Sequence, residues 1–325
     1  MQLLGERLRA VLDGSAEGSA SARDRGRRLF PAGLEAEKSS IFVRCTRVKR
    51  THQSAQNVLK GLGLDGGVDL YVRHSERETL WPSRRTRGRQ NALIDRANET
   101  NTFPGQADLK TKIAEIVGVS EEDVKWTTVR EVFACYEAHG VPLPVEALRS
   151  GVADVVQDYT GWMWGRWFNQ REMARLSLGP FLAEMLTIMG ARGQDRGVPE
   201  AGITSTPKLV VFSGHDSTLV PVLAALKIYD DKWPPYASYI SLDVAEDELG
   251  QRLVRVVFNG EEKVLPGAEG AWIPLTALQE RLEDVMPTPE DAIESDSDDN
   301  SSTASSEISA AVSASSSGSA DKANK

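Results

Sequence analysis

The chain has 325 residues and 40% apolar content, enough to bury a core as one large domain or two smaller ones. A net charge of −9 argues against a general polyanion-binding surface, and two cysteines, Cys45 and Cys135, are too few for a disulfide framework. No apolar run approaches the roughly 18 residues of a membrane helix, and no secretory signal is visible, so the sequence as written predicts a cytoplasmic chain unless a missing segment targets it elsewhere.

Most of the negative charge lies near the C-terminus. Residues 285–325 hold eight acidic and two basic residues, which is six of the nine net negative charges. From residue 288 the chain is rich in Ser, Ala and Asp and cannot bury enough apolar surface to offset the entropy of ordering. We predict a disordered acidic tail at 288–325. The basic clusters 23–28 and 84–89 are interpreted as solvated loops, and we expect no nucleic-acid partner.

The N-terminal part predicts a helix and then a strand followed by a helix. A one-sided apolar stripe over residues 4–12 is typical of a helix of about three turns. The apolar run Ile41–Val43 predicts a buried strand that delivers Arg44 at its carboxyl end. Apolar residues at helical spacing over 46–62 predict the helix that follows.

The middle of the chain is mainly helical in pattern. Short helical pieces, including 109–117 and 121–136, occupy residues 93–151. A longer helical stretch, 158–189, is rich in tryptophan and is interrupted or kinked near Gly179–Pro180. Its aromatic residues favour core packing, with a wall for lipid as the alternative.

A second strand and helix follow. The β-branched, apolar run Leu209–Phe212 predicts a buried strand of a parallel or mixed sheet. Helical spacing begins at Ser217, and Pro221 is expected in the first helical turn, where its missing N–H costs nothing. Further on, 239–244 and 253–258 alternate like the strands of a hairpin, and 275–285 predicts a last helix.

His215 and Asp216 lie between this strand and helix. The carboxyl end of a strand and the amino end of a helix together favour anion binding. His215 can therefore donate to an oxyanion such as phosphate, and Asp216 can act as a general acid toward a leaving oxygen. The alternative is structural, because Asp216 or Ser217 can cap the helix.

Two segments together resemble a known family. Val43–Thr51, followed by Ser54–Gln56 and Leu59–Leu62, resembles the strand-then-helix arginine motif of the histidine acid phosphatases, the second branch of the histidine phosphatase superfamily. Ser213–Leu219 is similar to that family's second signature, and the two occur in the family's order. Weaker similarities occur at 78–82, 138–144, 258–260 and 274–278, and the middle segment most resembles the lysophosphatidic acid phosphatase subgroup. The resemblance covers residues 2–285.

The resemblance implies an α/β fold with a central mixed sheet flanked by helices and an inserted α-helical cap. The core would comprise residues 1–92 and 151–287, and the cap, which contacts the leaving group, residues 93–150. The implied function is phosphomonoester hydrolysis through a phosphohistidine. The substrate would be a small phosphomonoester or a lysophospholipid-type molecule, with no cofactor and no metal, and the oligomeric state stays open.

The resemblance also assigns roles to three residues. Arg44 would clamp phosphate oxygens with its planar fork of donors. His215 would hydrogen-bond the phosphoryl group in the transition state. Asp216 would protonate the departing alcohol, an effect worth about a hundred- to ten-thousand-fold in rate.

The family's nucleophile is a histidine in an Arg-His-Gly-x-Arg-x-Pro motif on its first strand, and no such segment precedes Gln2 in this sequence. We therefore expect a chain without its nucleophile, without two phosphate-binding arginines and without a central strand, which would leave neighbouring strand edges unpaired. Three interpretations stay open: a start further upstream, a phosphate-binding scaffold that does not cleave, or a protein that interacts mainly through its tail. The segment Arg73–Arg77 keeps the Arg-His-x-x-Arg spacing, but it lies after Arg44 and has Ser75 in place of the glycine.

Overall fold

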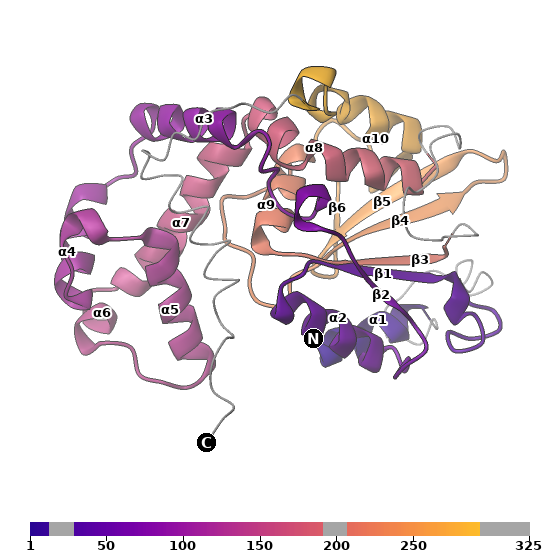
Figure 1. The fold of residues 1–325 in the computed structure, drawn as a ribbon, viewed down its shortest axis with the longest axis horizontal. Helices are drawn as coiled ribbons and strands as arrows, with labels where there is room; N and C mark the ends of the chain where they lie inside the picture. Colours follow the sequence, from indigo (N-terminus) through magenta and orange to yellow (C-terminus); the bar gives the residue numbers. More distant parts are fainter. Residues whose placement is uncertain (13–28, 191–206, 293–325) are drawn as a thin grey trace. The chain divides into compact units, whose positions relative to one another are not determined.

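The computed structural model describes residues 1–12, 29–190 and 207–292 (Figure 1). The chain divides into two compact units: unit 1 comprises Met1–Ser83, Leu178–Leu219 and Pro235–Met286, and unit 2 comprises Arg84–Ser177, Val220–Pro234 and Pro287–Lys325. Every strand that the structure describes belongs to unit 1, and helices build unit 2, so the predicted α/β class is confirmed. The predicted insertion, 93–150, lies inside unit 2, which extends beyond it at both ends.

Unit 1 contains a parallel sheet of three strands in the order β2-β1-β3. The strands are β1 (Ile41–Cys45), β2 (Leu70–Val72) and β3 (Leu209–Ser213), and the register places Cys45 opposite both Val72 and Ser213. The central strand, β1, is buried along its whole length. The sequence predicted β3 to be buried as well, and this was wrong: all five of its residues are half-buried, because β3 is an outer strand.

A second, antiparallel sheet follows in the chain. The predicted hairpin is present as β4 (Ile240–Glu246) and β5 (Arg252–Phe258), with β6 (Glu261–Lys263) and β7 (Trp272–Pro274) also pairing with β5. The strands β6 and β7 have three residues each, too few to show an alternating pattern in the sequence.

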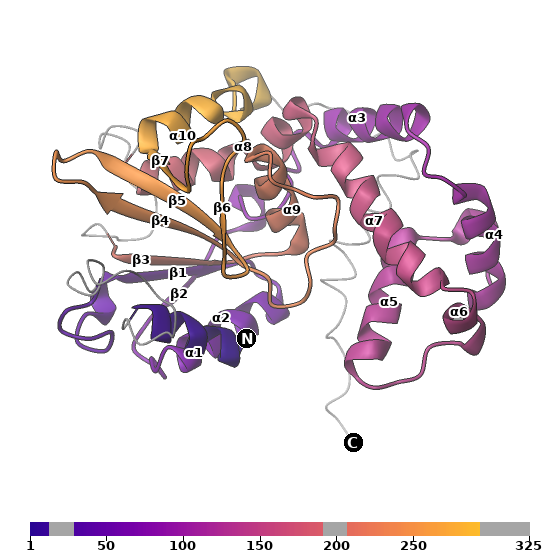
Figure 2. The ribbon, with the colours of Figure 1, turned by 180° about the vertical axis from the view of Figure 1, so that it is seen from behind.

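β3 and β4 each end a sheet. Figures 1 and 2, which are opposite views, both place β3 and β4 next to each other, with β1 and β2 beyond β3 and with β5 beyond β4. Within the described residues, the facing edges of β3 and β4 have no strand partner. The apolar side chains on β3 and the first half of β4 are correspondingly only half-buried. That the family's first strand is missing from this chain stays a prediction.

Helices cover both faces of the strands in unit 1. On one face lie α1 (Gln2–Leu12) and α2 (Lys49–Gly61), and on the other α10 (Leu275–Arg281) and the part of α8 (Arg171–Ile188) that begins at Leu178 (Figures 1 and 2). The two helices α1 and α2 touch at Gly5 and Gly61, where an added Cβ would lie 2.2 Å from a backbone oxygen of the other helix. This close approach brings Leu4, Leu8 and Leu12 onto the core between α2 and β1.

Unit 2 is built around α7 (Val152–Phe168), which carries three of the seven tryptophans. Trp164, Trp167 and Phe168 are each 1% exposed in the core of this unit, so the core-packing interpretation of the aromatic residues holds for them. The other helices are α3 (Arg87–Thr100), α4 (Gln106–Val117), α5 (Trp126–Ala138), α6 (Val145–Arg149) and the parts of α8 and α9 (Asp216–Ala225) assigned to this unit.

Several predicted boundaries were wrong. The long helical stretch breaks at Asn169–Gln170, between α7 and α8, and Pro180 lies inside α8 rather than at a break. Pro221 likewise lies inside α9, as its sixth residue, because this helix begins at Asp216, one residue before the predicted start at Ser217. Proline leaves only one backbone carbonyl without its helical donor, and the surrounding helix tolerates this at both positions.

Short 3-10 turns complete the described chain, at Lys38–Ser40, Ser75–Arg77, Glu121–Asp123, Glu283–Val285 and Pro289–Ala292. The last one shows that the predicted disordered tail does not begin at residue 288. Asp291 is 2.9 Å from Arg89 and 3.1 Å from Arg175, which fixes this turn on unit 2. The rest of the predicted tail and the basic cluster 23–28 lie outside the described residues.

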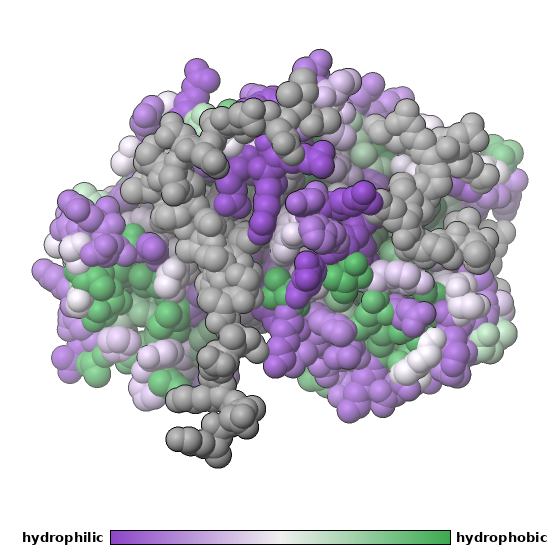
Figure 3. All heavy atoms as spheres, in the orientation of Figure 1, coloured by the Kyte–Doolittle hydropathy of each residue, from purple (hydrophilic) through white to green (hydrophobic). Residues whose placement is uncertain are grey.

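The visible surface mixes polar and apolar side chains. Figure 3 shows hydrophilic residues interspersed with smaller apolar patches over the described atoms that face the viewer. Within the described ranges, no helix is both long enough and apolar enough to cross a membrane.

Candidate functional site

The carboxyl ends of β1 and β3 bring distant segments together. The two strands are parallel and in register at Cys45 and Ser213, so the chain leaves both at the same edge of the sheet. Thr46 follows β1 and donates its backbone N–H to the Ser213 carbonyl at 3.4 Å. His215 lies two residues after β3. A short loop and then a helix follow each of the two strands, so the start of α2 lies beside the start of α9.

His215 is held from three sides at this edge. Its Nε2 lies 3.0 Å from the Thr46 hydroxyl, and its Nδ1 lies 3.3 Å from Nη2 of Arg50 in the first turn of α2. The indole of Trp81 stacks on the imidazole with ring centroids 5.9 Å apart. Burial, with a smaller contribution from the Arg50 charge, lowers the pKa of His215 to about 4. The imidazole is therefore neutral at pH 7.

Asp216 is the first residue of α9 and accepts a hydrogen bond from the Ser217 N–H at 2.8 Å. The carboxylate thus lies at the positive end of the helix dipole, immediately beside His215. The loop is closed by Thr218, whose Oγ1 accepts the His215 N–H at 3.0 Å and donates to the Leu80 carbonyl. The predicted His-Asp pair is thus in place at the strand end.

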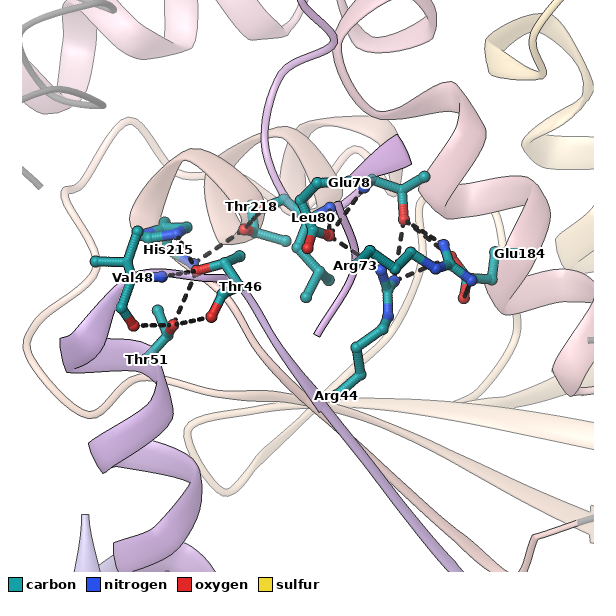
Figure 4. A network of polar contacts seen from close by, with 11 residues as sticks. Arg44, Thr46, Val48, Thr51, Arg73, Glu78, Leu80, Glu184, His215 and Thr218 are labelled. Carbon is teal, nitrogen blue, oxygen red and sulfur yellow. Dashed lines mark hydrogen bonds and ion pairs between the residues drawn. The ribbon is translucent and has the colours of Figure 1, made fainter. Parts of the chain in front are cut away.

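The structure gives Arg44 different partners from those predicted. Its guanidinium is 1% exposed and lies 3.0 Å from each of the carboxylates of Glu78 and Glu184 and from the Thr79 hydroxyl. Burial lowers the pKa of Arg44, and the two carboxylates oppose that effect. Figure 4 shows Arg44 and His215 at opposite ends of the network, pointing to different groups.

The reason lies in strand geometry. Successive side chains on a strand point to opposite faces of the sheet, not beyond its end. Arg44 is still inside β1, so its side chain packs against the Phe212 ring, 4.9 Å from the ring centroid, and reaches Glu184 of α8. Residues after the strand are the ones that face the edge. Arg44 and His215 were both expected to bind the phosphoryl group, but the arginine that lies beside His215 is Arg50.

The Arg44 network nevertheless supports the site through the segment 78–81. The Oε1 atom of Glu78 accepts the Arg44 guanidinium at 3.0 Å and also the backbone N–H groups of Thr79 and Leu80, at 2.9 and 2.8 Å. Leu80 then accepts from Thr218, and Trp81 covers His215. The buried Arg44–Glu78 ion pair, drawn in Figure 4, therefore fixes the segment whose Trp81 stacks on the imidazole.

The segment 73–77 lies outside the cluster around His215. Arg73 makes two 2.8 Å contacts with the Glu184 carboxylate. The His74 side chain is 62% exposed and lies 3.9 Å from the Glu76 carboxylate. Among the residues described, the imidazole of His215 makes hydrogen bonds and ring contacts with Thr46, Arg50 and Trp81, and none with a second histidine.

Sequence reasoning missed Arg50, Thr46 and Thr51. The signal was present, because all three lie where the chain passes from a buried strand into a helix, the same arrangement that singled out His215 and Asp216. In the described ranges, no group of three His, Cys, Asp or Glu side chains is arranged to hold a metal ion.

Comparisons with known proteins give consistent relatives, although no family model matches the chain. Counting factor 60 from Dictyostelium discoideum is 27% identical over 79% of this chain and 63% of its own length. Lysophosphatidic acid phosphatase type 6 from Bos taurus is 25% identical over 72% of this chain and 55% of its own. Lysosomal acid phosphatase from Bos taurus is 25% identical over 70% of this chain and 57% of its own. The chain therefore spans less than two thirds of these relatives.

Among solved structures, the phytase from Citrobacter braakii superimposes with a TM-score of 0.66 and covers 90% of this chain and 88% of its own, at 15% identity. At this identity the match establishes a common fold. The strand-to-helix edges that hold Arg50 and His215 are accordingly part of a fold found in other proteins.

Proposed function

We propose that this chain, which belongs to the histidine acid phosphatase family, binds the phosphoryl group of a phosphomonoester where His215 meets Arg50, as part of a hydrolase site. The convergence of Arg50, His215 and Asp216 at the carboxyl ends of β1 and β3 is the observation that carries the proposal. Arg50 is exposed and carries a permanent charge, so it is available to a dianionic ligand. Asp216 is the proposed acid for the leaving oxygen.

The proposed substrate class is the phosphomonoesters. Lysophospholipid-type substrates are the finer proposal, supported by the 25% identity to a lysophosphatidic acid phosphatase. Arg44 is proposed to be the buried anchor of segment 78–81 rather than a ligand of phosphate, because its donors contact Glu78, Thr79 and Glu184.

We propose further that this 325-residue chain binds phosphate without turnover. A phosphohistidine mechanism needs a second histidine in line with the phosphorus atom, and none contacts His215 in the described part of the chain. An assay with p-nitrophenyl phosphate should therefore give no hydrolysis above that of the His215→Ala variant. Hydrolysis by the wild type that His215→Ala abolishes would instead place a nucleophile within this sequence, with His74→Ala as the next variant to assay.

Anion binding should raise the pKa of His215. In the free protein this pKa is about 4, and a bound dianion favours the charged imidazolium. Binding then takes up a proton, so the affinity should increase as the pH falls through the pKa of the complex and level off below about 4. Sulfate is a suitable probe because it stays dianionic over this range.

NMR titration of the imidazole resonances with and without sulfate measures this shift. His139, an exposed residue at the C-terminal end of α5, serves as an internal control whose imidazole resonances should not move when sulfate is added at constant pH. An unchanged His215 titration at saturating sulfate would place the anion elsewhere.

A further inference from the structure

The contact with Arg50 indicates which nitrogen of His215 carries the proton. A guanidinium can only donate hydrogen bonds. The 3.3 Å contact between Arg50 Nη2 and His215 Nδ1 therefore makes Nδ1 the acceptor. A neutral imidazole has one N–H group, and here it must lie on Nε2, where it faces the Thr46 Oγ1 at 3.0 Å.

Two threonines, Thr46 and Thr51, extend this series of hydrogen bonds into the protein interior, with each donor on the side of Arg50. Thr51 Oγ1 lies 2.8 Å from the Val48 carbonyl and 3.2 Å from the Thr46 carbonyl, and both carbonyls can only accept. The single hydroxyl proton of Thr51 is thus committed to the backbone. Thr46 must then donate its own proton to Thr51 Oγ1, 2.8 Å away, which turns a lone pair of Thr46 toward Nε2 of His215.

The chain of bonds is shielded from water at its inner end. Thr46 is 0% exposed and Thr51 is 3% exposed, while Arg50 at the outer end is exposed. Figure 4 shows Thr46, Thr51 and Val48 grouped on one side of His215. A buried acceptor that has no competing water imposes its direction on the donor.

We propose that Thr46 and Thr51 are positioning residues that hold His215 in the Nε2–H tautomer, so that Nδ1 is the nitrogen presented beside Arg50 to an oxyanion. Only the identity of the anion rests on the proposed function; the tautomer is a property of the free protein. When an anion binds and Nδ1 takes up a proton, Thr46 remains as the acceptor for Nε2–H. The threonine thereby stabilises the imidazolium that the anion requires.

The test is the tautomer of His215 at pH 7, read from the ¹⁵N chemical shifts of the two imidazole nitrogens. The wild type should show a protonated Nε2 and an unprotonated Nδ1. Thr46→Val, which keeps the shape and removes the acceptor, leaves only the longer, exposed Arg50 contact to hold the tautomer, so it should populate the Nδ1–H form in part and weaken sulfate binding about three- to tenfold. Thr46→Ser restores the hydroxyl and should restore both readouts to near wild-type values.

A matched control is Thr127→Val in unit 2, which removes a buried hydroxyl that has no hydrogen-bond partner. It should change neither readout. Thr51→Val is a second test of the same proposal. It removes the acceptor of the Thr46 hydroxyl proton, which can then turn toward Nε2, so the tautomer should shift in the same direction as in Thr46→Val.

The outcomes separate the two proposals. An Nδ1–H tautomer in the wild type, or an unchanged tautomer in folded Thr46→Val and Thr51→Val, overturns the positioning role. The expected tautomer shift in a wild-type protein that does not bind sulfate supports the positioning role and rejects the proposed function.

Discussion

Replacing Arg44 by methionine should lower the free energy of unfolding by about 3 to 5 kcal/mol, which is typical when one partner of a buried ion pair is removed. The Glu78 and Glu184 side chains are 1% and 9% exposed, so their carboxylates would stay buried with less compensation. Glu184 keeps Arg73 and the Thr79 hydroxyl, whereas Glu78 keeps, among the described residues, only two backbone N–H groups. Most of the loss should therefore come from Glu78.

Urea unfolding followed by circular dichroism measures this loss. The double variant Arg44→Met with Glu78→Gln should recover part of it, because the amide oxygen can still accept from Thr79 and Leu80 without a buried charge. Arg255→Met is the matched control in the same unit: its ion pairs with Asp243 and Glu262 are more exposed, and it should cost no more than about 1 kcal/mol. Equal losses in Arg44→Met and Arg255→Met would contradict the anchoring role of Arg44.

Replacing Arg50 by methionine should weaken the binding of inorganic phosphate at least about tenfold, since hydrogen bonds to charged groups contribute about 1.5 to 3 kcal/mol. Isothermal titration at pH 6 measures the affinity. Arg50→Lys should fall between the wild type and Arg50→Met, because an ammonium keeps the charge but loses the planar fork of donors.

Arg47→Met is the control for Arg50→Met, because Arg47 is also exposed and lies three residues earlier, in the loop that precedes α2. It removes the same charge and should change the affinity much less. A second readout is independent of the ligand: the pKa of His215 should rise in Arg50→Met, although only in part, because burial is the larger cause of its depression. If Arg47→Met weakens phosphate binding as much as Arg50→Met does, the binding reflects general charge and not a site.

The sequence predicted the elements of unit 1 better than their surroundings. Apolar runs and helical spacing located β1, β3 and α2, because these signals are local. The exposure of β3 was not predictable, since an apolar strand reads the same in the middle of a sheet and at its edge. The boundary between α7 and α8 was misplaced because Gly179–Pro180 was expected to interrupt or kink the helix, whereas α8 continues through Pro180.

The site was predicted only in part, again because local patterns are visible in the sequence and contacts in space are not. His215 and Asp216 were found from a strand that ends next to a helix, and that arrangement is visible in the residues themselves. Arg50 was missed because the arginine nearest to the strand was preferred, although a strand residue projects from a face of the sheet and a residue in the next helical turn faces its edge. The roles of Thr46 and Thr51 depend on which atoms meet in space, which no one-dimensional pattern contains.

The outer backbone groups of β3 and β4 have a practical consequence for work with the isolated polypeptide. In the part of the chain that the structure describes, these amides and carbonyls have no strand partner, so they can pair with any extended segment that reaches them, including one from an identical molecule. The half-buried valine and leucine side chains of the same strands add apolar surface to such a contact. Concentrated preparations should therefore be prone to intermolecular sheet formation, and dilute, cold samples are the appropriate starting point for the titrations described above.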